Sequence, residues 1–129
     1  MKIPFIKAHG AGNDFVIIDQ NVDFIRKSKK IIKKLCDRRF GIGCDQLILL
    51  KKVGSYHEVS FYNSDGSLGK NCGNGLRCAF KYLTENKKYK KVVIKSQKFF
   101  HIGKKIGEEY QINVGEVSII KISDKSLSL

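Results

Sequence analysis

The stretch that decides the fold is NSDGSLGKNCGNGLRC, residues 63–78. An apolar segment ends at Asn63, and the residues at 64–67 are typical of a tight turn. A helical pattern then starts near Gly75, so Cys72 stands at the expected entrance of a helix. This order of strand, turn and helix is the framework on which the other segments are placed.

Short apolar and β-branched runs predict strands on both sides of that helix. Before it, we expect strands at 3–7, 15–18, 46–51 and 58–63. One helix, with Asp23 as its N-cap and apolar residues on one face, should lie between the second and third strands and end before Gly41. After it, we expect strands at 92–96, 99–102, 110–114 and 117–122, then a frayed tail.

The helix expected from Gly75 to Asn86 is apolar nearly all round, which indicates that a sheet encloses it. Many strands interrupted by two helices predict an α+β domain: a curved mixed or antiparallel sheet, or a barrel, wrapped around this central helix. No repeat or linker divides residues 1–129, so we expect a single domain.

Composition narrows the class of protein. Apolar residues make up 42% of the chain, which excludes a disordered tail. The N-terminal residues show no signal-peptide pattern, and the longest aliphatic cluster, residues 47–50, is too short to span a membrane. We therefore expect a cytoplasmic protein that does not enter a membrane.

The net charge of +13 comes from 25 basic and 12 acidic residues. A nucleic-acid surface would explain such a charge, but only four of the basic residues are arginines and the lysines are scattered. The interpretation that we prefer is a solvated basic surface without nucleic-acid binding, which would also attract an acidic small molecule.

The four cysteines contain no CxxC pair, and no histidine lies near them in sequence. This spacing does not indicate a zinc site, so we expect no metal and reduced thiols. Cys44 and Cys78 lack a glycine-rich setting and are interpreted as core residues.

Cys72 differs from the other cysteines in its position. The first N–H groups of a helix lack partners and carry partial positive charge, which binds a carboxylate and lowers the pKa of a nearby thiol. Gly73 and Gly75 allow the backbone to approach a ligand closely. No histidine is near enough in sequence to assist nucleophilic attack, so proton transfer by Cys72 is the functional hypothesis. The alternative is that Cys72 only packs at a glycine-rich helix entry.

Three amide side chains are candidates for binding a zwitterionic ligand: Asn13, Gln46 and Asn63. Each follows a glycine turn or loop, or ends a strand, so the alternative for each is a turn or cap residue. His9 and the aspartates at 14, 45 and 65 also border glycine turns, and we interpret them as structural or turn-forming residues.

Four segments taken together resemble the diaminopimelate epimerase family. They are HGAGNDF (9–15), DRRFGIGCDQ (37–46), NSDGS (63–67) and CGNGLRC (72–78), in the family's order and at familiar spacing. The match is strong from about Ile3 to Asn86 and thins beyond Val92, where SQKFF replaces a small Thr/Gly turn. Proline racemase-like and phenazine-pathway isomerases are neighbours, but HGAGNDF with CGNG favours the diaminopimelate enzyme.

The resemblance implies a racemase or epimerase that needs no cofactor and inverts the α-carbon linking LL- and meso-diaminopimelate, on the route to lysine and peptidoglycan. Two cysteines serve opposite faces of the substrate in this family, and Cys72 matches the one that removes the proton. Asn13, Gln46 and Asn63 match substrate-binding positions, and Gly73 with Asn74 matches the carboxylate-binding loop. A homodimer is usual.

The family has two similar lobes, whereas this chain resembles the amino-terminal lobe alone and lacks the second cysteine with its glycine loop. We therefore expect a truncated form, a fragment or half of a split protein, inactive without a second lobe. The alternative functions are a non-catalytic remnant that binds a small amino acid or a protein partner, and a basic nucleic-acid-binding module.

Overall fold

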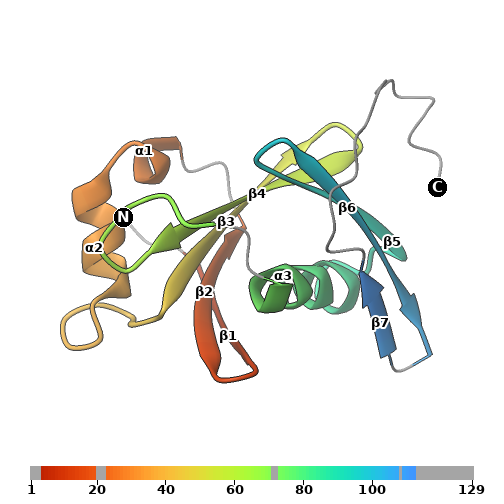
Figure 1. Ribbon diagram of the computed structural model, residues 1–129, viewed down its shortest axis with the longest axis horizontal. Helices are drawn as coiled ribbons and strands as arrows, with labels where there is room; N and C mark the ends of the chain where they lie inside the picture. The colour runs from red at the N-terminus through yellow and green to blue at the C-terminus, as the bar shows by residue number, and fades with distance from the viewer. Residues whose placement is uncertain (1–3, 20–22, 71–72, 108, 113–129) are drawn as a thin grey trace.

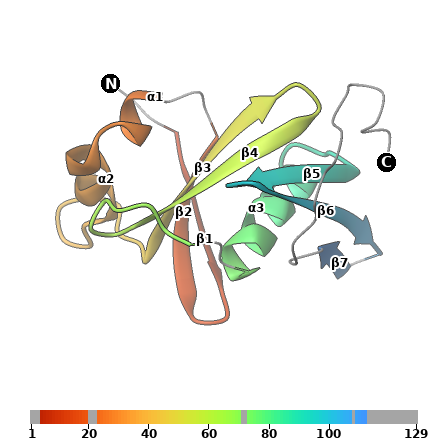
Figure 2. The ribbon, with the colours of Figure 1, turned by 45° about the horizontal axis from the view of Figure 1, so that its top comes forward.

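The computed structural model describes residues 4–19, 23–70, 73–107 and 109–112. In this part of the chain seven strands form one sheet whose spatial order follows the sequence, with three helices beside it (Figures 1 and 2). The strands are β1 (Ile6–Gly10), β2 (Asn13–Asp19), β3 (Gln46–Val53), β4 (Tyr56–Asn63), β5 (Lys91–Ser96), β6 (Phe99–Ile106) and β7 (Glu109–Ile112). The helices are α1 (Asp23–Arg26), α2 (Lys29–Cys36) and α3 (Gly73–Glu85).

The sheet is mixed, which is one of the arrangements that the sequence pattern predicts. β2 pairs with β3 and β4 pairs with β5 in parallel, while the other neighbours are antiparallel. The parallel crossovers are made by the α1–α2 segment and by α3, and parallel strands require such connections. The α+β class and the sheet curved around the second predicted helix are therefore confirmed.

The central strands are apolar on both faces because each face has its own core. On β2, Phe15 and Ile17 belong to the core that includes α3, whereas Val16 and Ile18 belong to the core that includes α2. β3 alternates in the same way. The continuous apolar runs of these strands thus reflect burial on both sides.

Helix α3 lies in the concave side of the sheet (Figure 2) and contacts strands from β1 to β7. Its residues Leu76, Phe80 and Leu83 are completely buried. Arg77 and Lys81 are exposed, so the helix is not enclosed all round and keeps a solvated strip. The curved sheet therefore covers only part of the circumference of the helix.

The first predicted helix is two helices. α1 ends at Arg26, and Ser28 then adopts an extended conformation and caps α2 by accepting a hydrogen bond from the Ile31 N–H at 3.2 Å. A serine cap of this kind starts a new helix. The expectation that a single helix is capped by Asp23 is wrong, because Asp23 is itself the first residue of α1.

The expected strands agree with the observed ones within a few residues at their ends. The predicted strand at 110–114 corresponds to β7, but residues 113 and 114 lie outside the described residues, as do the strand expected at 117–122 and the tail.

Gly75 has a packing role. A Cβ atom placed there would be 2.5 Å from Cε1 of Phe61 and 3.3 Å from Cε1 of Phe15, and both rings are buried. The missing side chain therefore lets the first turn of α3 lie directly on two aromatic rings of the sheet.

We predict that Gly75→Ala lowers the free energy of unfolding by about 1–3 kcal/mol, because the added methyl group overpacks this contact. Gly10→Ala is the matched control, since its Cβ would meet the Cys78 sulfur at an ordinary 3.6 Å. Urea unfolding of both variants measures the difference. Equal stabilities would contradict the close packing, and Phe61→Leu should reduce the cost of Gly75→Ala.

Candidate functional site

The predicted amide residues lie at one end of three neighbouring strands. Asn13 is the first residue of β2, Gln46 the first of β3 and Asn63 the last of β4. Because β3 runs parallel to β2 and antiparallel to β4, these ends coincide, and Gln46 pairs directly with Asn63 in the ladder. The topology thus gathers three side chains that are far apart in sequence.

The three amides also share one face of the sheet. Side chains alternate along a strand, so Asn13 lies on the face of Phe15, and Asn63 on the face of Phe61. Gln46 is likewise on the face of Ile48, and all three apolar residues belong to the core beneath α3. The three amides therefore lie on the face that α3 covers, next to the edge of its apolar core.

Helix α3 begins at the same end. The Asn74 Nδ2 atom is 3.5 Å from Asn13 Oδ1, which brings the helix entrance to the strand ends. Gly73 is the first residue of α3 and Asn74 the second, both half-buried. Their place at a helix N-terminus leaves backbone N–H groups without intrahelical partners. Four predicted site residues beside Gly73 are thus brought together: Asn13, Gln46, Asn63 and Asn74.

Local contacts hold two of these amides in place. Gln46 Nε2 donates to Asn63 Oδ1 at 3.2 Å, and Asn63 Nδ2 donates to Ser67 Oγ at 3.0 Å. Gly69 leaves room for them, since a Cβ there would lie 2.9 Å from the Gln46 amide nitrogen. Each amide group has more donors and acceptors than these bonds use, so it can also bind a polar ligand.

Cys72, the predicted catalytic residue, lies outside the described residues. Its position in the sequence, directly before Gly73, connects it to the entrance of α3. The proposed ionised thiol and its role in proton transfer stay predictions.

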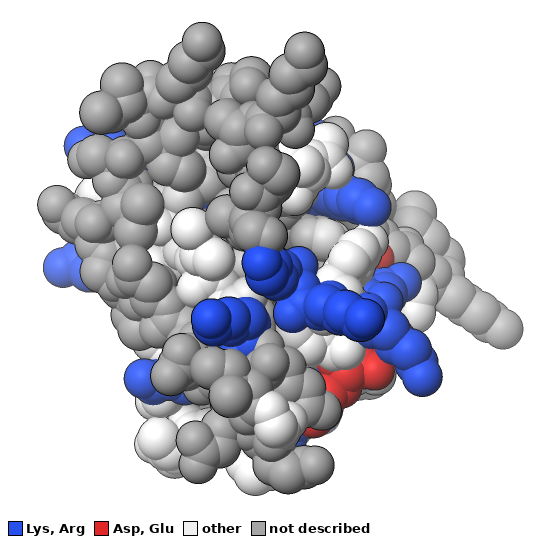
Figure 3. All heavy atoms as spheres, turned by 90° about the vertical axis from the view of Figure 1, so that its right-hand side faces the viewer, with Lys and Arg blue, Asp and Glu red and all other residues white. Residues whose placement is uncertain are grey.

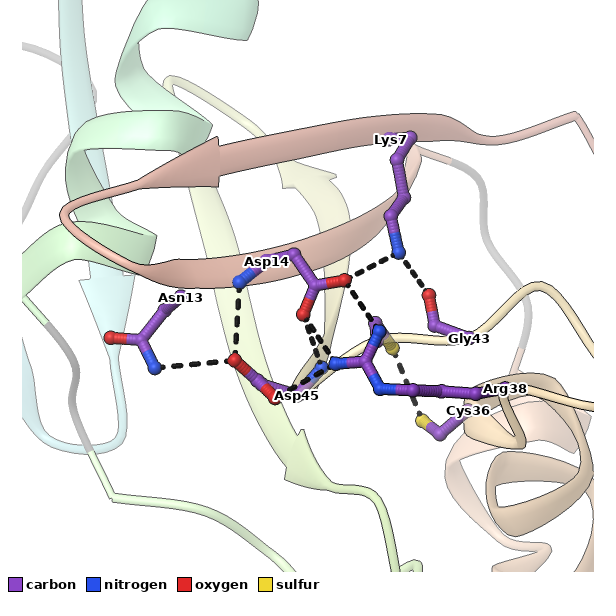
Figure 4. A network of polar contacts seen from close by, with 8 residues as sticks. Lys7, Asn13, Asp14, Cys36, Arg38, Gly43 and Asp45 are labelled. Carbon is purple, nitrogen blue, oxygen red and sulfur yellow. Dashed lines mark hydrogen bonds and ion pairs between the residues drawn. The ribbon is translucent and has the colours of Figure 1, made fainter.

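A network of charges supports the site from the other side (Figure 4). Arg38 donates two hydrogen bonds to the Asp14 carboxylate, at 2.9 and 2.8 Å, and a third to Asp45 at 2.9 Å. Lys7 donates to Asp14 at 2.7 Å and to the Gly43 carbonyl. Asp14 and Asp45 were expected to form or cap turns. That expectation did not include their main contacts, because both carboxylates belong to an ion-pair network.

This network reaches the amide cluster through Asp45. Asp45 Oδ2 accepts from the Asn13 side chain at 3.3 Å and from the Asp14 N–H at 3.2 Å, while the Asp45 N–H donates to Asp14 Oδ1 at 2.9 Å. Asp14 lies in β2 and Asp45 directly before β3, and the two carboxylates would repel each other without the guanidinium between them. Arg38 therefore acts as a positioning residue for Asn13. Sequence reasoning missed it, because Asp14 and Asp45 are 31 residues apart in sequence and meet only in the folded sheet.

The network shifts the pKa of its members. The hydrogen bonds from Arg38 and then Lys7 hold the pKa of Asp14 well below its ordinary value, and the carboxylate raises the pKa of Arg38 in turn. Both groups therefore keep their charges at all physiological pH values.

The remaining candidates are not members of this cluster. His9 is exposed on β1. Cys44 is buried, as expected for a core thiol, whereas Cys78 is only half-buried and packs at the margin of the α3 core. Asp65 Oδ1 accepts a 2.8 Å hydrogen bond from the Ser67 N–H, the turn-forming role expected of it.

The surface beside β5 to β7 carries several basic side chains (Figure 3). Lys88, Lys90, Lys91 and Lys104 are exposed. The expected absence of nucleic-acid binding stays a prediction. Among the described residues, no three His, Cys, Asp or Glu side chains are gathered as a metal site requires. No helix in the same part of the chain is long and apolar enough to cross a membrane.

Solved structures share this fold. Methylitaconate-delta-isomerase matches with a TM-score of 0.63 at 14% identity, covering 95% of this chain and 39% of that one. A phenazine biosynthesis protein of the PhzF family from Enterococcus faecalis matches with a TM-score of 0.61 at 15% identity, covering 85% and 43%. The class is therefore an α+β lobe that also occurs within larger proteins.

The sequence narrows this class to one family. A family model described as diaminopimelate epimerase matches residues 5–119. The diaminopimelate epimerase of Rickettsia felis is 36% identical over 124 residues, covering 94% of this chain and 46% of the relative. That of Pelagibacter ubique is 47% identical over 95 residues, covering 73% and 34%. The chain belongs to the diaminopimelate epimerase family, a family of isomerases, and spans less than half the length of these relatives.

We predict that Asp14→Asn changes how stability depends on pH. With a lowered pKa in the folded state, Asp14 contributes stability above its ordinary value near 4, and this contribution is lost as the pH falls below about 4. The variant should lose roughly 1–2 kcal/mol at neutral pH and show a flatter acid limb. Urea midpoints of the variant and of the wild type from pH 7 to 2 measure this difference. Parallel curves for Asp14→Asn and wild type would contradict the assignment.

Arg38 and Arg39 offer a matched pair of variants. We predict that Arg38→Ala increases the mobility of the Asn13 side chain, because Asp45 loses the guanidinium that holds it. Arg39→Ala should not, since Arg39 only stacks on the exposed Phe40 ring at 5.9 Å. Relaxation of the Asn13 side-chain amide in NMR spectra measures this. An equal effect of both variants would show that Arg38 does not position Asn13.

Proposed function

We propose that this chain is the substrate-binding lobe of an epimerase that interconverts LL- and meso-diaminopimelate by proton transfer at the α-carbon. The observation that carries the proposal is the amide cluster on the α3 face of the sheet, immediately beside the helix that Cys72 precedes in sequence. Family membership supports this class of reaction, because the relatives are named diaminopimelate epimerase.

The cluster suits an amino-acid substrate. The N–H groups that open α3 at Gly73 and Asn74 favour a carboxylate, since a helix N-terminus binds anions. The amide oxygens of Gln46 and Asn63 can accept hydrogen bonds from an ammonium group, and their N–H groups can donate to a second carboxylate. A substrate held by both ends would present its α-carbon to a group at the helix entrance.

Cys72 is the residue that we propose removes the α-proton. Unpaired N–H groups at a helix N-terminus stabilise a thiolate, which can then act as a base at neutral pH. This chemistry uses side chains alone, so we propose that no pyridoxal phosphate or metal takes part.

Inversion requires a second acid–base group on the opposite face of the substrate, because a single base returns the proton to the side from which it came. The chain spans less than half the length of its relatives, and we propose that a second lobe outside this chain provides that group. A homodimer of the completed protein and a cytoplasmic location, both expected from the sequence, stay predictions.

We predict that the chain alone inverts LL-diaminopimelate negligibly, and that adding the remainder of the Rickettsia felis relative, beyond the matched region, restores inversion. Incorporation of deuterium from D2O at the α-carbon and appearance of the meso form measure this. In the mixture, Cys72→Ala should lower the rate by about 10²–10⁴, as loss of a general base does. Cys78→Ala is the control and should retain activity.

Robust inversion by the 129-residue chain alone would contradict the need for a second lobe. Retained inversion in the Cys72→Ala mixture would contradict the role of Cys72.

A non-catalytic protein that binds a small amino acid is the second candidate, because the amide cluster could bind a ligand without any reaction. Calorimetry with diaminopimelate separates the two. Binding that Cys72→Ala leaves unchanged, together with no deuterium exchange in any mixture, would favour this candidate.

A further inference from the structure

Two cysteine side chains face each other in the core on the α2 side of the sheet. Cys36 is the last residue of α2, and Cys44 follows the next loop. Their sulfur atoms are 3.4 Å apart within hydrogen-bonding contact, and both residues are only 2% exposed. The contact is drawn in Figure 4 between the two sulfur atoms.

The main chain also joins these residues. The Cys44 N–H donates to the Cys36 carbonyl at 3.2 Å, so the two backbones are neighbours, as a disulfide requires. The N–H groups of Ile42 and Gly43 both donate to the Leu35 carbonyl, at 3.0 and 3.1 Å. These bonds close the loop at its base, and the two cysteines lie at that closure.

We propose that Cys36 and Cys44 form an oxidation site, at which a small peroxide converts the thiol pair into a disulfide. In the first step one sulfur attacks a peroxide oxygen, the O–O bond breaks, and a sulfenic acid and water form. In the second step the other sulfur attacks the sulfenic sulfur and releases a second water. The two thiols lose two protons and two electrons, and one hydrogen peroxide becomes two water molecules.

Either sulfur can attack the peroxide first, because the other lies 3.4 Å away and can then resolve the sulfenic acid. The hydrogen bond between them lowers the pKa of Cys44 and, together with burial, raises that of Cys36, so one thiolate at a time is favoured. Cys78 lies on the other side of the sheet, where it packs against Gly10 and the core under α3.

The loop offers a route for the oxidant. Residues 37–41 are exposed, while Gly43 and Cys44 are buried behind them. A local opening of this loop admits a molecule as small as peroxide without unfolding the sheet. The disulfide would then fix the segment that carries Arg38 and ends at Asp45. This inference does not depend on the proposed function, because it concerns only the thiols and their loop.

The test uses the 129-residue chain with Cys72→Ser and Cys78→Ser, so that the only thiols are those of Cys36 and Cys44. Treatment with one equivalent of hydrogen peroxide should consume both thiols and lower the intact mass by two hydrogen atoms. Trypsin cuts after Arg38 and Arg39, so residues 35–38 and 40–51 should remain joined until dithiothreitol separates them. Adding Cys44→Ser, or Cys36→Ser, should abolish the joined peptide.

The oxidised protein should also melt at a higher temperature than the reduced one, because the cross-link restricts the unfolded chain. Peptide mapping of the oxidised wild type, with all four cysteines present, should show the same linked pair and so does not rely on any variant folding. Linkage of Cys72 or Cys78 instead, oxygen addition without a cross-link, or a lower melting temperature after oxidation would each overturn the proposal.

Discussion

The register of the three central strands is the constraint on which the candidate site depends. Phe15 pairs with Gln46, and Gln46 pairs with Asn63, so the amides reach one edge on one face. A slip of one residue would turn Gln46 toward α2 and place Leu47 beside the entrance of α3. Burial of apolar side chains on both faces opposes such a slip, because it would exchange residues between two filled cores.

The same packing determines where α3 begins. Phe15 and Phe61 form a platform of two rings, and only a residue without a side chain at position 75 can lie on it at this distance. The platform therefore brings the N-terminal turn of α3 next to the amides. Apolar packing thus determines where the N–H groups of the helix entrance lie relative to the amide side chains. The sequence suggested that Gly75 lets the backbone approach a ligand closely, but its contact with the core explains why a glycine is needed here.

Much of the fold could be predicted from local pattern. Each central strand is a continuous apolar or alternating run, and α3 follows a glycine-rich entry, so their existence and order were accessible. The break at Ser28 was not, because the apolar spacing of α1 and α2 is compatible with one helix. A serine between lysines is a weak signal until the cap hydrogen bond is seen.

The amide residues of the site could be predicted from the sequence, but the ion-pair network that holds them in place could not. Asn13, Gln46 and Asn63 stood out as amides at strand ends, and the resemblance to a family grouped them. The role of Arg38 was not accessible, because it depends on the adjacency of Asp14 and Asp45, which are distant in sequence and meet only through the β2–β3 pairing. Long-range charge networks of this kind follow from topology, which local patterns do not specify.

Three consecutive residues that lead into β3 show how tightly the two faces are linked. Cys44 is buried in the core beside α2, Asp45 belongs to the ion-pair network, and Gln46 points to the face of α3. Rotation of the backbone at any of them would move the other two, because the three residues are consecutive in the chain. The loop between α2 and β3 is therefore a mechanical connection between the thiol pair and the amide cluster. Arg38, bound to both Asp14 and Asp45, makes that connection stiff, because it ties the start of the loop to both strands on which the amides depend.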